Sequence, residues 1–217
     1  MPLACPYLPP RQAHFRYIDG AIAAPYYRHL LDRGYRRSGG YLYRPVCDGC
    51  SKCQILRVPI ATFTPTRDQR RVWRRGRQAF TTRVAPLSYT PEKLDMYRRY
   101  LQQQHGDPAA DVDEARYRAH LLETCLAERS FELQLWHGGQ LAGIGILDRL
   151  GDALSTVYFF FDPEFHRLSP GTYSALCEIE LARAWGLAYY YLGYYIQACP
   201  SMSYKARFTP HELKELP

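Results

Sequence analysis

The sequence predicts an α+β protein in which a mixed sheet with flanking helices is joined to a smaller unit that carries cysteines. Two observations support this fold class. Strand-like and helix-like segments follow one another in the second half of the chain. The first 60 residues are rich in Tyr, Arg, Gly and Pro and contain the motif Cys47-x-x-Cys50-x-x-Cys53. We therefore expect two domains, residues 1–85 and residues 86–217, that pack against each other.

The composition excludes several classes of protein. Hydrophobic residues make up 47% and charged residues 23% of the 217 residues, which is typical of a globular chain and excludes a disordered or fibrous one. No apolar stretch reaches the roughly 18 residues that a membrane-spanning helix needs. Residues 1–6 have neither the basic nor the apolar region of a signal peptide. We expect a soluble, cytoplasmic protein.

The first half of the chain predicts a strand and a basic helix. Residues 55–58 (Ile-Leu-Arg-Val) follow the cysteines directly and have the composition of a strand. A helix from residue 64 or 66 to about Phe80 is indicated by Thr66 and Gln69, which have the spacing of a capping box. Residues 1–60 as a whole are expected to form short strands and loops.

Two further helices are expected before the sheet. The first has Thr90 as its N-cap, Pro91 at its first position and Gly106 just past its end. The second spans roughly residues 113–129, because apolar residues recur at helical spacing at Ala115, Ala119, Leu122 and Leu126.

The second half predicts the main sheet. Residues 130–137 alternate in polarity, Gly138-Gly139 makes a two-residue turn, and residues 140–148 form the return strand. A strand over residues 153–161, a loop over 166–171, a helix over about 172–185 and a strand over 189–194 follow. This order is typical of the N-acetyltransferase-type fold, in which the loop and the helix start hold an acyl donor. The acetyl-CoA signature is only partly present at Arg167–Gly171, which disfavours coenzyme A and an acetyltransferase.

The charge is divided unevenly. Residues 1–110 carry 17 Arg and 2 Lys against 7 acidic residues, a formal charge of +12, whereas residues 111–217 carry −5. Six arginines crowd the basic helix around Trp73, and several lie four residues apart, so that they repel one another without an anionic partner. They are Arg67, Arg70, Arg71, Arg74, Arg75 and Arg77. Phosphates would relieve this repulsion, which predicts an RNA-binding face; a solvated face paired with the acidic half is the alternative.

The cysteines suggest a metal site. The spacing of Cys47, Cys50 and Cys53 allows three thiolates to converge on a zinc ion or an iron–sulfur cluster, and Cys5, in an equally Pro-rich loop, is the candidate fourth ligand. Reduced structural thiols without metal are the alternative. The other three cysteines lie at apolar periodic positions and are expected in the core.

Several segments together resemble the arginyl-tRNA–protein transferase family, and in particular its short bacterial branch. The resemblance covers the chain from Cys5 to about Pro210. The segments that carry it are residues 35–39 (YRRSG), 43–47 (YRPVC), 158–163 (YFFFDP), 191–196 (YLGYYI) and 202–205 (MSYK).

The resemblance implies an enzyme of the bacterial N-end rule pathway. Such an enzyme takes an amino acid from aminoacyl-tRNA, leucine in the short branch and arginine in the longer eukaryotic members, and joins it to a protein that begins with Asp or Glu. The aminoacyl ester is already activated, so neither ATP nor coenzyme A is required. The family's cluster or zinc binding would involve Cys5, Cys47, Cys50 and Cys53, although the eukaryotic cysteine pattern differs from the one here.

We expect a cationic pocket to hold the acidic side chain of the acceptor, because arginine pairs well with carboxylate. Its candidates are Arg36, Arg37, Lys205 and Arg207. Three tyrosines are candidates for hydrogen bonds to the ester or the amine in the catalytic centre: Tyr158, Tyr191 and Tyr195. Packing is the alternative role for the tyrosines of the last strand. A non-catalytic RNA-binding protein with a metal knuckle remains the rival function of another class.

Overall fold

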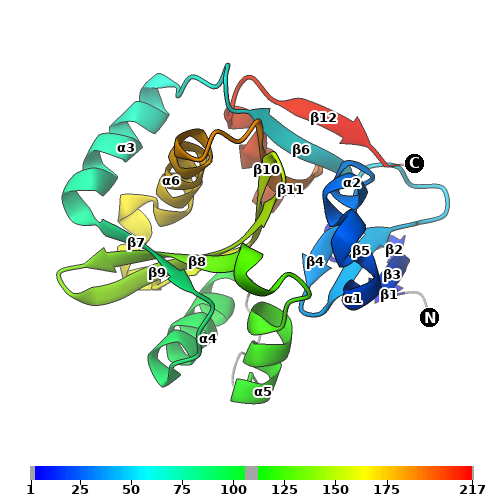
Figure 1. The fold of residues 1–217 in the computed structure, drawn as a ribbon, viewed down its shortest axis with the longest axis horizontal. Helices are drawn as coiled ribbons and strands as arrows, with labels where there is room; N and C mark the ends of the chain where they lie inside the picture. The colour runs from blue at the N-terminus through cyan, green and yellow to red at the C-terminus, as the bar shows by residue number, and fades with distance from the viewer. Residues whose placement is uncertain (1–2, 106–111, 217) are drawn as a thin grey trace.

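A seven-stranded mixed sheet forms the centre of the computed structural model, which describes residues 3–105 and 112–216 (Figure 1). The strand order is β12-β6-β11-β10-β9-β8-β7. All neighbours are antiparallel except β10 and β11, which run parallel. The strands are β6 (Gln54–Pro59), β7 (Thr81–Pro86), β8 (Ser130–His137), β9 (Gln140–Leu150), β10 (Ala153–Phe161), β11 (Tyr189–Tyr195) and β12 (Glu212–Glu215). The predicted fold class and every predicted strand are confirmed.

The parallel pair β10–β11 separates after only three residue pairs. The pairing runs from Ala153 opposite Tyr189 to Ser155 opposite Tyr191. Beyond it, β10 shifts register against β9 between Thr156 and Tyr158, and β11 shifts against β6 at Gly193, whose φ is +90°. Such irregularities bend the strands apart. A gap therefore follows between the two strands beyond Ser155 and Tyr191.

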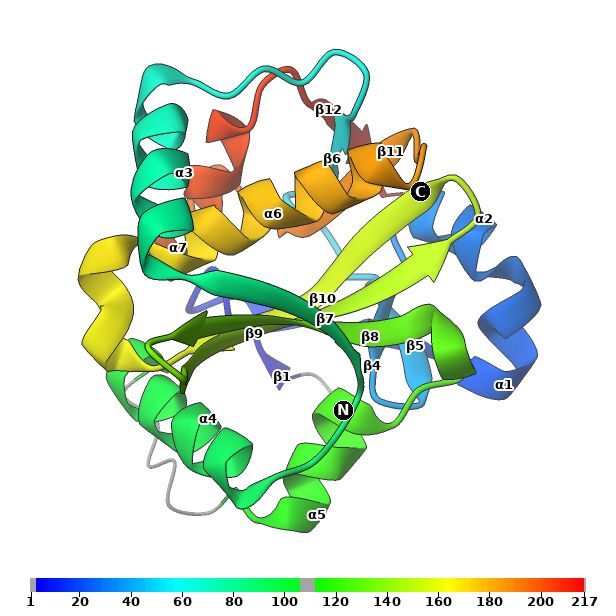
Figure 2. The ribbon, with the colours of Figure 1, turned by 60° about the vertical axis from the view of Figure 1, so that its left-hand side comes forward.

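Helices cover both faces of this sheet (Figure 2). On one face lie α3 (Arg67–Ala79) and α6 (Pro170–Ala184), and on the other lie α4 (Pro91–His105) and α5 (Glu114–Tyr117). Thr66 caps α3 with the predicted capping box, because the Thr66 hydroxyl accepts from the Gln69 amide at 3.2 Å and the Gln69 side chain accepts from the Thr66 amide at 2.8 Å. None of the helices in the described ranges is long and apolar enough to cross a membrane.

Two predicted helix limits need comment. The helix expected over residues 113–129 is wrong, because α5 ends at Tyr117, a π-helical turn covers Arg118–Leu122 and the backbone of Glu123 is extended. The prediction relied on the spacing of other apolar residues, whereas the residues that anchor this segment are Tyr117 and Leu121, both fully buried. The predicted end at Gly106 lies outside the described residues.

A small three-stranded sheet lies beside the separated strands (Figure 1). Its order is β3-β5-β4, and two short helices and a 3₁₀ turn cover it. Its strands are β3 (Phe15–Asp19), β4 (Arg36–Ser38) and β5 (Tyr41–Pro45), and the segments that cover them are α1 (Gly20–Ala23), η1 (Ala24–Tyr26) and α2 (Tyr27–Asp32). These helices correct the expectation of strands and loops alone in this region. Before them, β1 (Leu3–Ala4) and β2 (Gln12–Ala13) pair as a separate two-stranded antiparallel sheet. Since β6 and β7 belong to the large sheet, the chain passes from the small sheet to the large one between residues 45 and 54. The expected domain boundary at residue 85 stays a prediction.

Gly76 allows α3 to approach α6 closely. A Cβ at this position would lie 2.2 Å from the ring of Tyr173, which packs against Trp73 and Phe80. We expect Gly76→Ala to lower the free energy of unfolding by about 1–3 kcal/mol, because the steric clash outweighs the helix propensity gained. Urea denaturation measures this change, with exposed Gln78→Ala as the control that stays nearly neutral. A stabilised Gly76→Ala protein would contradict this packing.

Candidate active site between β10 and β11

Two cationic side chains reach the gap between β10 and β11. Arg36, on β4, donates from Nη2 to the carbonyl of Thr156, the first residue of β10 beyond the paired segment. Lys205 lies in the 3₁₀ turn η6 (Tyr204–Arg207), which follows the short helix α7 (Pro200–Ser203), and its Nζ donates to the carbonyl of Tyr194 at 2.7 Å. The two strands that part therefore each hold one cation through a backbone carbonyl.

Both cations converge on Gly193. A Cβ built there would lie 3.5 Å from Arg36 Nη2 and 3.6 Å from Lys205 Nζ, so this backbone position is in contact with both cationic groups, and its φ of +90° favours glycine. Arg36 Nη1 is buried without a hydrogen-bond partner in the part of the chain that the structure describes. A buried, unpaired donor of this kind is costly, and an anion bound in the gap would satisfy it.

The proximity of the cations changes the chemistry of Lys205. Burial and the positive charge of Arg36 lower the pKa of Lys205 to about 7. The ammonium is therefore only partly charged near neutral pH, and a carboxylate placed beside it would favour the charged form. The arrangement suits the binding of a carboxylate or of an oxyanion that develops during acyl transfer.

Aromatic rings frame this cationic site. The ring of Tyr43 on β5 meets that of Tyr194 edge to face at 6.0 Å, on the side of the small sheet. On β10, half-buried Tyr158 packs against Tyr97 and His120, with ring centroids 5.8 Å apart in both pairs. Burial and nearby tyrosines raise the pKa of Tyr158, so its hydroxyl keeps its proton and remains a hydrogen-bond donor.

Arg37, a predicted substrate-binding residue, lies apart from Arg36 and Lys205, and its role in binding stays a prediction. Its guanidinium pairs with Asp148 through contacts of 2.8 and 3.0 Å, and both side chains are fully buried. It also donates to the carbonyl of Glu123 at 2.9 Å. The side chain points to the face of β4 opposite to that of its neighbour Arg36, since side chains alternate along a strand. Arg37 therefore ties β4 to β9.

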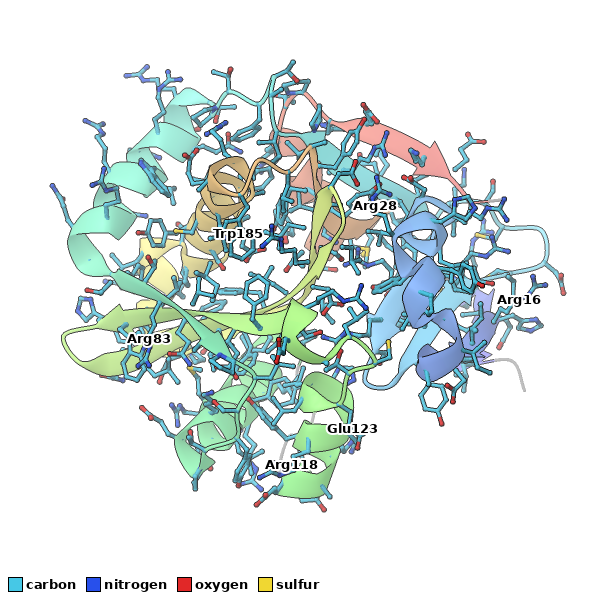
Figure 3. All side chains as sticks on the ribbon, viewed as in Figure 1. Arg16, Arg28, Arg83, Arg118, Glu123 and Trp185 are labelled. Carbon is cyan, nitrogen blue, oxygen red and sulfur yellow. The ribbon has the colours of Figure 1, made fainter. Side chains whose placement is uncertain are left out.

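Tyr191, a predicted catalytic residue, lies in a buried hydrogen-bond network, and its catalytic role stays a prediction. Its hydroxyl donates to Asp32 at 2.5 Å and accepts from Arg57 at 3.0 Å, and the residue is fully buried. Arg28, which Figure 3 shows between α2 and the large sheet, and Lys214 bind the same carboxylate at 2.8 Å. Burial raises the pKa of Asp32, but the hydrogen bonds that it accepts outweigh this effect and hold the pKa well below its usual range.

The remaining predicted site residues lie at the edge of the gap or beyond it. Tyr195 is half-buried against the core formed with α6. Arg207 is exposed, and its carbonyl accepts from the side chain of Gln69 at 3.1 Å, so η6 is anchored to α3. Of the four predicted cations, the structure thus brings Arg36 and Lys205 together, and it separates Arg37 from them.

The six arginines of α3 are all exposed and project outward, as the nitrogen-tipped side chains along this helix show (Figure 3). Their described contacts are weak or local. Arg71 lies 3.4 Å from Asp68 one turn away, and Arg75 donates to the Ser169 hydroxyl at 3.3 Å. The opposite side of α3 buries Gln69 and Gly76. Among the described residues, none of these arginines forms an ion pair with an acidic residue of the second half, so the helix presents a positive surface.

Cys5, Cys47, Cys50 and Cys53 line one cavity of about 500 Å³ beside the small sheet. Burial and the neighbouring thiols of Cys47, Cys5 and Cys50 raise the pKa of Cys53 to about 12. Four thiols suit zinc or an iron–sulfur cluster. Within residues 3–105 and 112–216, however, no three Cys, His, Asp or Glu side chains are close enough to hold an ion as they stand. A metal would therefore require the loop over residues 47–53 to close around it.

Sequence reasoning missed two groups that this site uses. Thr156 contributes the carbonyl that holds Arg36, and Gly193 leaves room for both cations. A glycine inside a run of tyrosines is a signal for a bulge, and residues 189–195 (YYYLGYY) contain that signal. The separation of β10 from β11, which exposes the carbonyl, has no signal in the local sequence.

Comparisons with known proteins agree on one family. Residues 3–71 match the family model described as arginine-tRNA-protein transferase, N terminus, and residues 92–215 match the model of its C terminus. A relative from Chromobacterium violaceum named aspartate/glutamate leucyltransferase is 40% identical over 98% of this chain and 88% of its own. A relative of the same name from Halorhodospira halophila is 37% identical over 96% of this chain and 89% of its own.

A solved structure supports the fold. The crystal structure of FemX matches 94% of this chain and 70% of its own with a TM-score of 0.54, at 10% sequence identity. At this level of identity the likeness concerns the fold alone, and it confirms the predicted architecture.

Proposed function

The chain belongs to the arginine-tRNA-protein transferase family, and from this premise we propose that it transfers leucine from leucyl-tRNA to proteins that begin with Asp or Glu. Two relatives that span nearly the whole chain are named for these acceptors and this amino acid. Arginyl transfer to the same acceptors is the alternative. Because the donor is aminoacyl-tRNA, the protein would act in the cytoplasm.

The observation that carries the acceptor assignment is the pair of cations at Gly193. In this proposal the β- or γ-carboxylate of the acceptor's first residue binds Arg36, including its unpaired Nη1, and Lys205. A neutral amide can accept a hydrogen bond from these groups but forms no ion pair with either cation, which would account for a choice of Asp and Glu over Asn and Gln. Arg207, at the exposed edge of η6, would contact the peptide beyond that residue or the tRNA.

The chemistry is acyl transfer and needs no cofactor. The acceptor amine attacks the carbonyl carbon of the aminoacyl ester, the new C–N bond forms, and the C–O bond to the tRNA ribose breaks. An α-amine has an ordinary pKa of about 7.7–8.0, so part of it is a neutral nucleophile at cellular pH. Catalysis then depends on position and on stabilisation of the oxyanion. Tyr158 and Tyr195, which flank the gap, are the proposed hydrogen-bond donors.

The tRNA would bind along α3. Its six exposed arginines lie on the same side of the sheet as α6, whose first residues follow the loop near the gap. Released counterions would supply the binding energy, and the aminoacyl end would enter between β10 and β11. The unequal charge of the two halves supports this orientation.

Labelled amino acid transfer tests the function directly. Leucyl-tRNA and arginyl-tRNA are each incubated with peptides that begin with Asp, Glu, Asn or Ala. We expect leucine on the Asp and Glu peptides and on neither control. If arginine is transferred to these peptides in place of leucine, the donor is arginyl-tRNA and the assignment of the acceptor site stands. Binding of charged and uncharged tRNA with equal affinity, without any transfer, would instead favour a non-catalytic RNA-binding protein.

The four cysteines are proposed to bind zinc or an iron–sulfur cluster. We expect protein purified without oxygen to bind one zinc ion or one iron–sulfur cluster per chain. The variants Cys47→Ser and Cys50→Ser should lose this metal, and their Tm should fall. Metal analysis identifies the element, and visible absorption separates a cluster from zinc. Cys125→Ser, a half-buried cysteine outside the cavity, is the control that retains the metal. Metal-free protein whose Tm does not respond to zinc or iron would leave these cysteines as structural thiols.

A further inference from the structure

Glu178 on α6 is a buried carboxylate without a cationic partner. It is 1% exposed, and no ion pair among residues 3–105 and 112–216 involves it. The other fully buried carboxylates are paired, since Glu132 binds Lys93 at 2.6 Å and Asp148 binds Arg37 at 2.8 Å. An unpaired buried charge is costly, and buried titratable groups of this kind cluster at functional sites.

Hydroxyl groups surround this carboxylate. Ser174, one turn earlier on α6, donates to Oε1 at 2.7 Å, and Tyr190 on β11 donates to Oε2 at 2.6 Å. The side chain of Thr156 on β10 also bonds to it. On β9, Gly145 leaves the necessary space, because a Cβ there would lie 3.0 Å from Oε1. Four elements thus hold one oxygen-rich cluster directly beneath the point where β10 and β11 part.

Thr156 connects this cluster to the proposed active site. Its hydroxyl faces Glu178, whereas its carbonyl accepts from Arg36 in the gap. Thr156 is half-buried, so one residue touches the buried carboxylate and also borders the space where the acceptor's amine would lie. A hydroxyl in this position can pass a proton, because it donates one as it accepts another.

We propose that Glu178 receives the proton of the acceptor's α-ammonium through the Thr156 hydroxyl, as a positioning residue of the transfer reaction; this rests on the proposed function. The ammonium gives a proton to Thr156 Oγ1, and the hydroxyl proton moves to the Glu178 carboxylate. The free amine forms the C–N bond to the ester carbonyl carbon. As the C–O bond to the ribose breaks, the ribose oxygen takes the proton from Glu178 by the reverse route, and the new amide nitrogen releases its second proton to solvent. The amide and the ribose hydroxyl are then neutral, and Glu178 ends ionised.

The surroundings of Glu178 shift its pKa into the range in which it can accept a proton near neutral pH. Burial raises its pKa to about 7, and the hydrogen bonds from Tyr190, Ser174 and Thr156 act in the opposite direction. The titratable groups that face it are Tyr190, Tyr204 of η6 and Cys177 of its own helix. All three are neutral near pH 7, because burial raises each pKa well above it. Below pH 7 the carboxyl group is neutral and cannot accept a proton; above pH 7 it can.

The test is the pH dependence of kcat with saturating Asp peptide. We expect the wild-type rate to rise through a limb near pH 7. Glu178→Gln removes the contribution of Glu178 to that limb and lowers kcat at pH 8 by about 30-fold, somewhat below the usual 10²- to 10⁴-fold range of general acid–base effects because Thr156 intervenes. Tyr190→Phe removes a donor to the ionised form, so it raises the pKa of Glu178 and moves the limb to higher pH. Tyr173→Phe, which removes a tyrosine hydroxyl from the same helix but no bond to Glu178, leaves the limb unchanged.

The titrations of Lys205 and of the acceptor amine are common to all variants, so the differences between the variants report on Glu178. A Glu178→Gln protein that folds with the wild-type kcat and the wild-type limb would overturn the proposal. If Glu178→Gln does not fold, Tyr190→Phe decides, and an unmoved limb overturns the proposal. A wild-type protein without any transfer activity would refute the proposed function instead, which the first experiment shows before any variant is made.

Discussion

Arg36→Ala is expected to raise the KM for peptides that begin with Asp or Glu by about 100-fold, while the affinity for tRNA changes little. The loss corresponds to about 2.7 kcal/mol, within the range for removal of one partner of a desolvated charge pair. Arg36 is 5% exposed and its Nη1 has no partner among the described residues, so its attraction for an incoming carboxylate is weakly screened. Steady-state kinetics at fixed leucyl-tRNA, together with tRNA binding, measures both quantities.

The loss of a buried arginine can also unfold a protein, so this experiment needs matched controls. Arg36→Lys keeps a charge but loses the second donor, and we expect a smaller rise in KM with the fold intact. Arg44→Lys alters a buried arginine on the other face of the small sheet, where it lies over the ring of Tyr35, and should leave the KM unchanged. An equal loss of acceptor and tRNA binding in Arg36→Lys would remove Arg36 from the acceptor pocket.

The elements that could be predicted from sequence are those whose signals are local. β8 and β10 begin and end at the predicted residues, because alternation of polarity and the flanking turns specify a strand without reference to the rest of the chain. The capping box of α3 is likewise contained within four residues. The prediction of a helix through the segment after α5 was wrong because its anchoring residues, Tyr117 and Leu121, pack against residues distant in sequence.

The candidate site could be predicted only in part, because contacts with residues distant in sequence decide which of the candidate side chains reach it. Arg36 and Arg37 are neighbours with the same chemistry. Only the pairing of Arg37 with Asp148, 111 residues later, shows which of the two is free for a ligand. Tyr191 is bound to Asp32, 159 residues earlier, and no local pattern signals this contact. Glu178 appears in the sequence as an ordinary helix glutamate. Its proposed role depends on its contacts with Thr156 on β10 and Tyr190 on β11.

The second large effect is expected on α3. Replacement of Arg70, Arg74 and Arg77 by Gln should weaken tRNA binding by about 100-fold at moderate salt and reduce the salt dependence. The slope of log K against log salt concentration should become less steep by about 2 to 3, since each phosphate contact contributes roughly 0.7 to 0.9. These arginines make no ion pair in the described chain, so folding should not suffer. Filter binding across a salt series measures both values.

The matched control removes the same number of charges from another face. Arg116, Arg118 and Arg129 are exposed in and after α5, and α5 lies on the opposite face of the sheet from α3 (Figure 1). If net charge alone governed the affinity, the two triple variants would weaken tRNA binding alike. If α3 follows the phosphate backbone, only its variant changes the slope, and KM for the acceptor peptide stays unchanged because Arg36 and Lys205 are untouched. Separate effects on the two substrates would establish that the tRNA and the acceptor reach the gap between β10 and β11 from different sides.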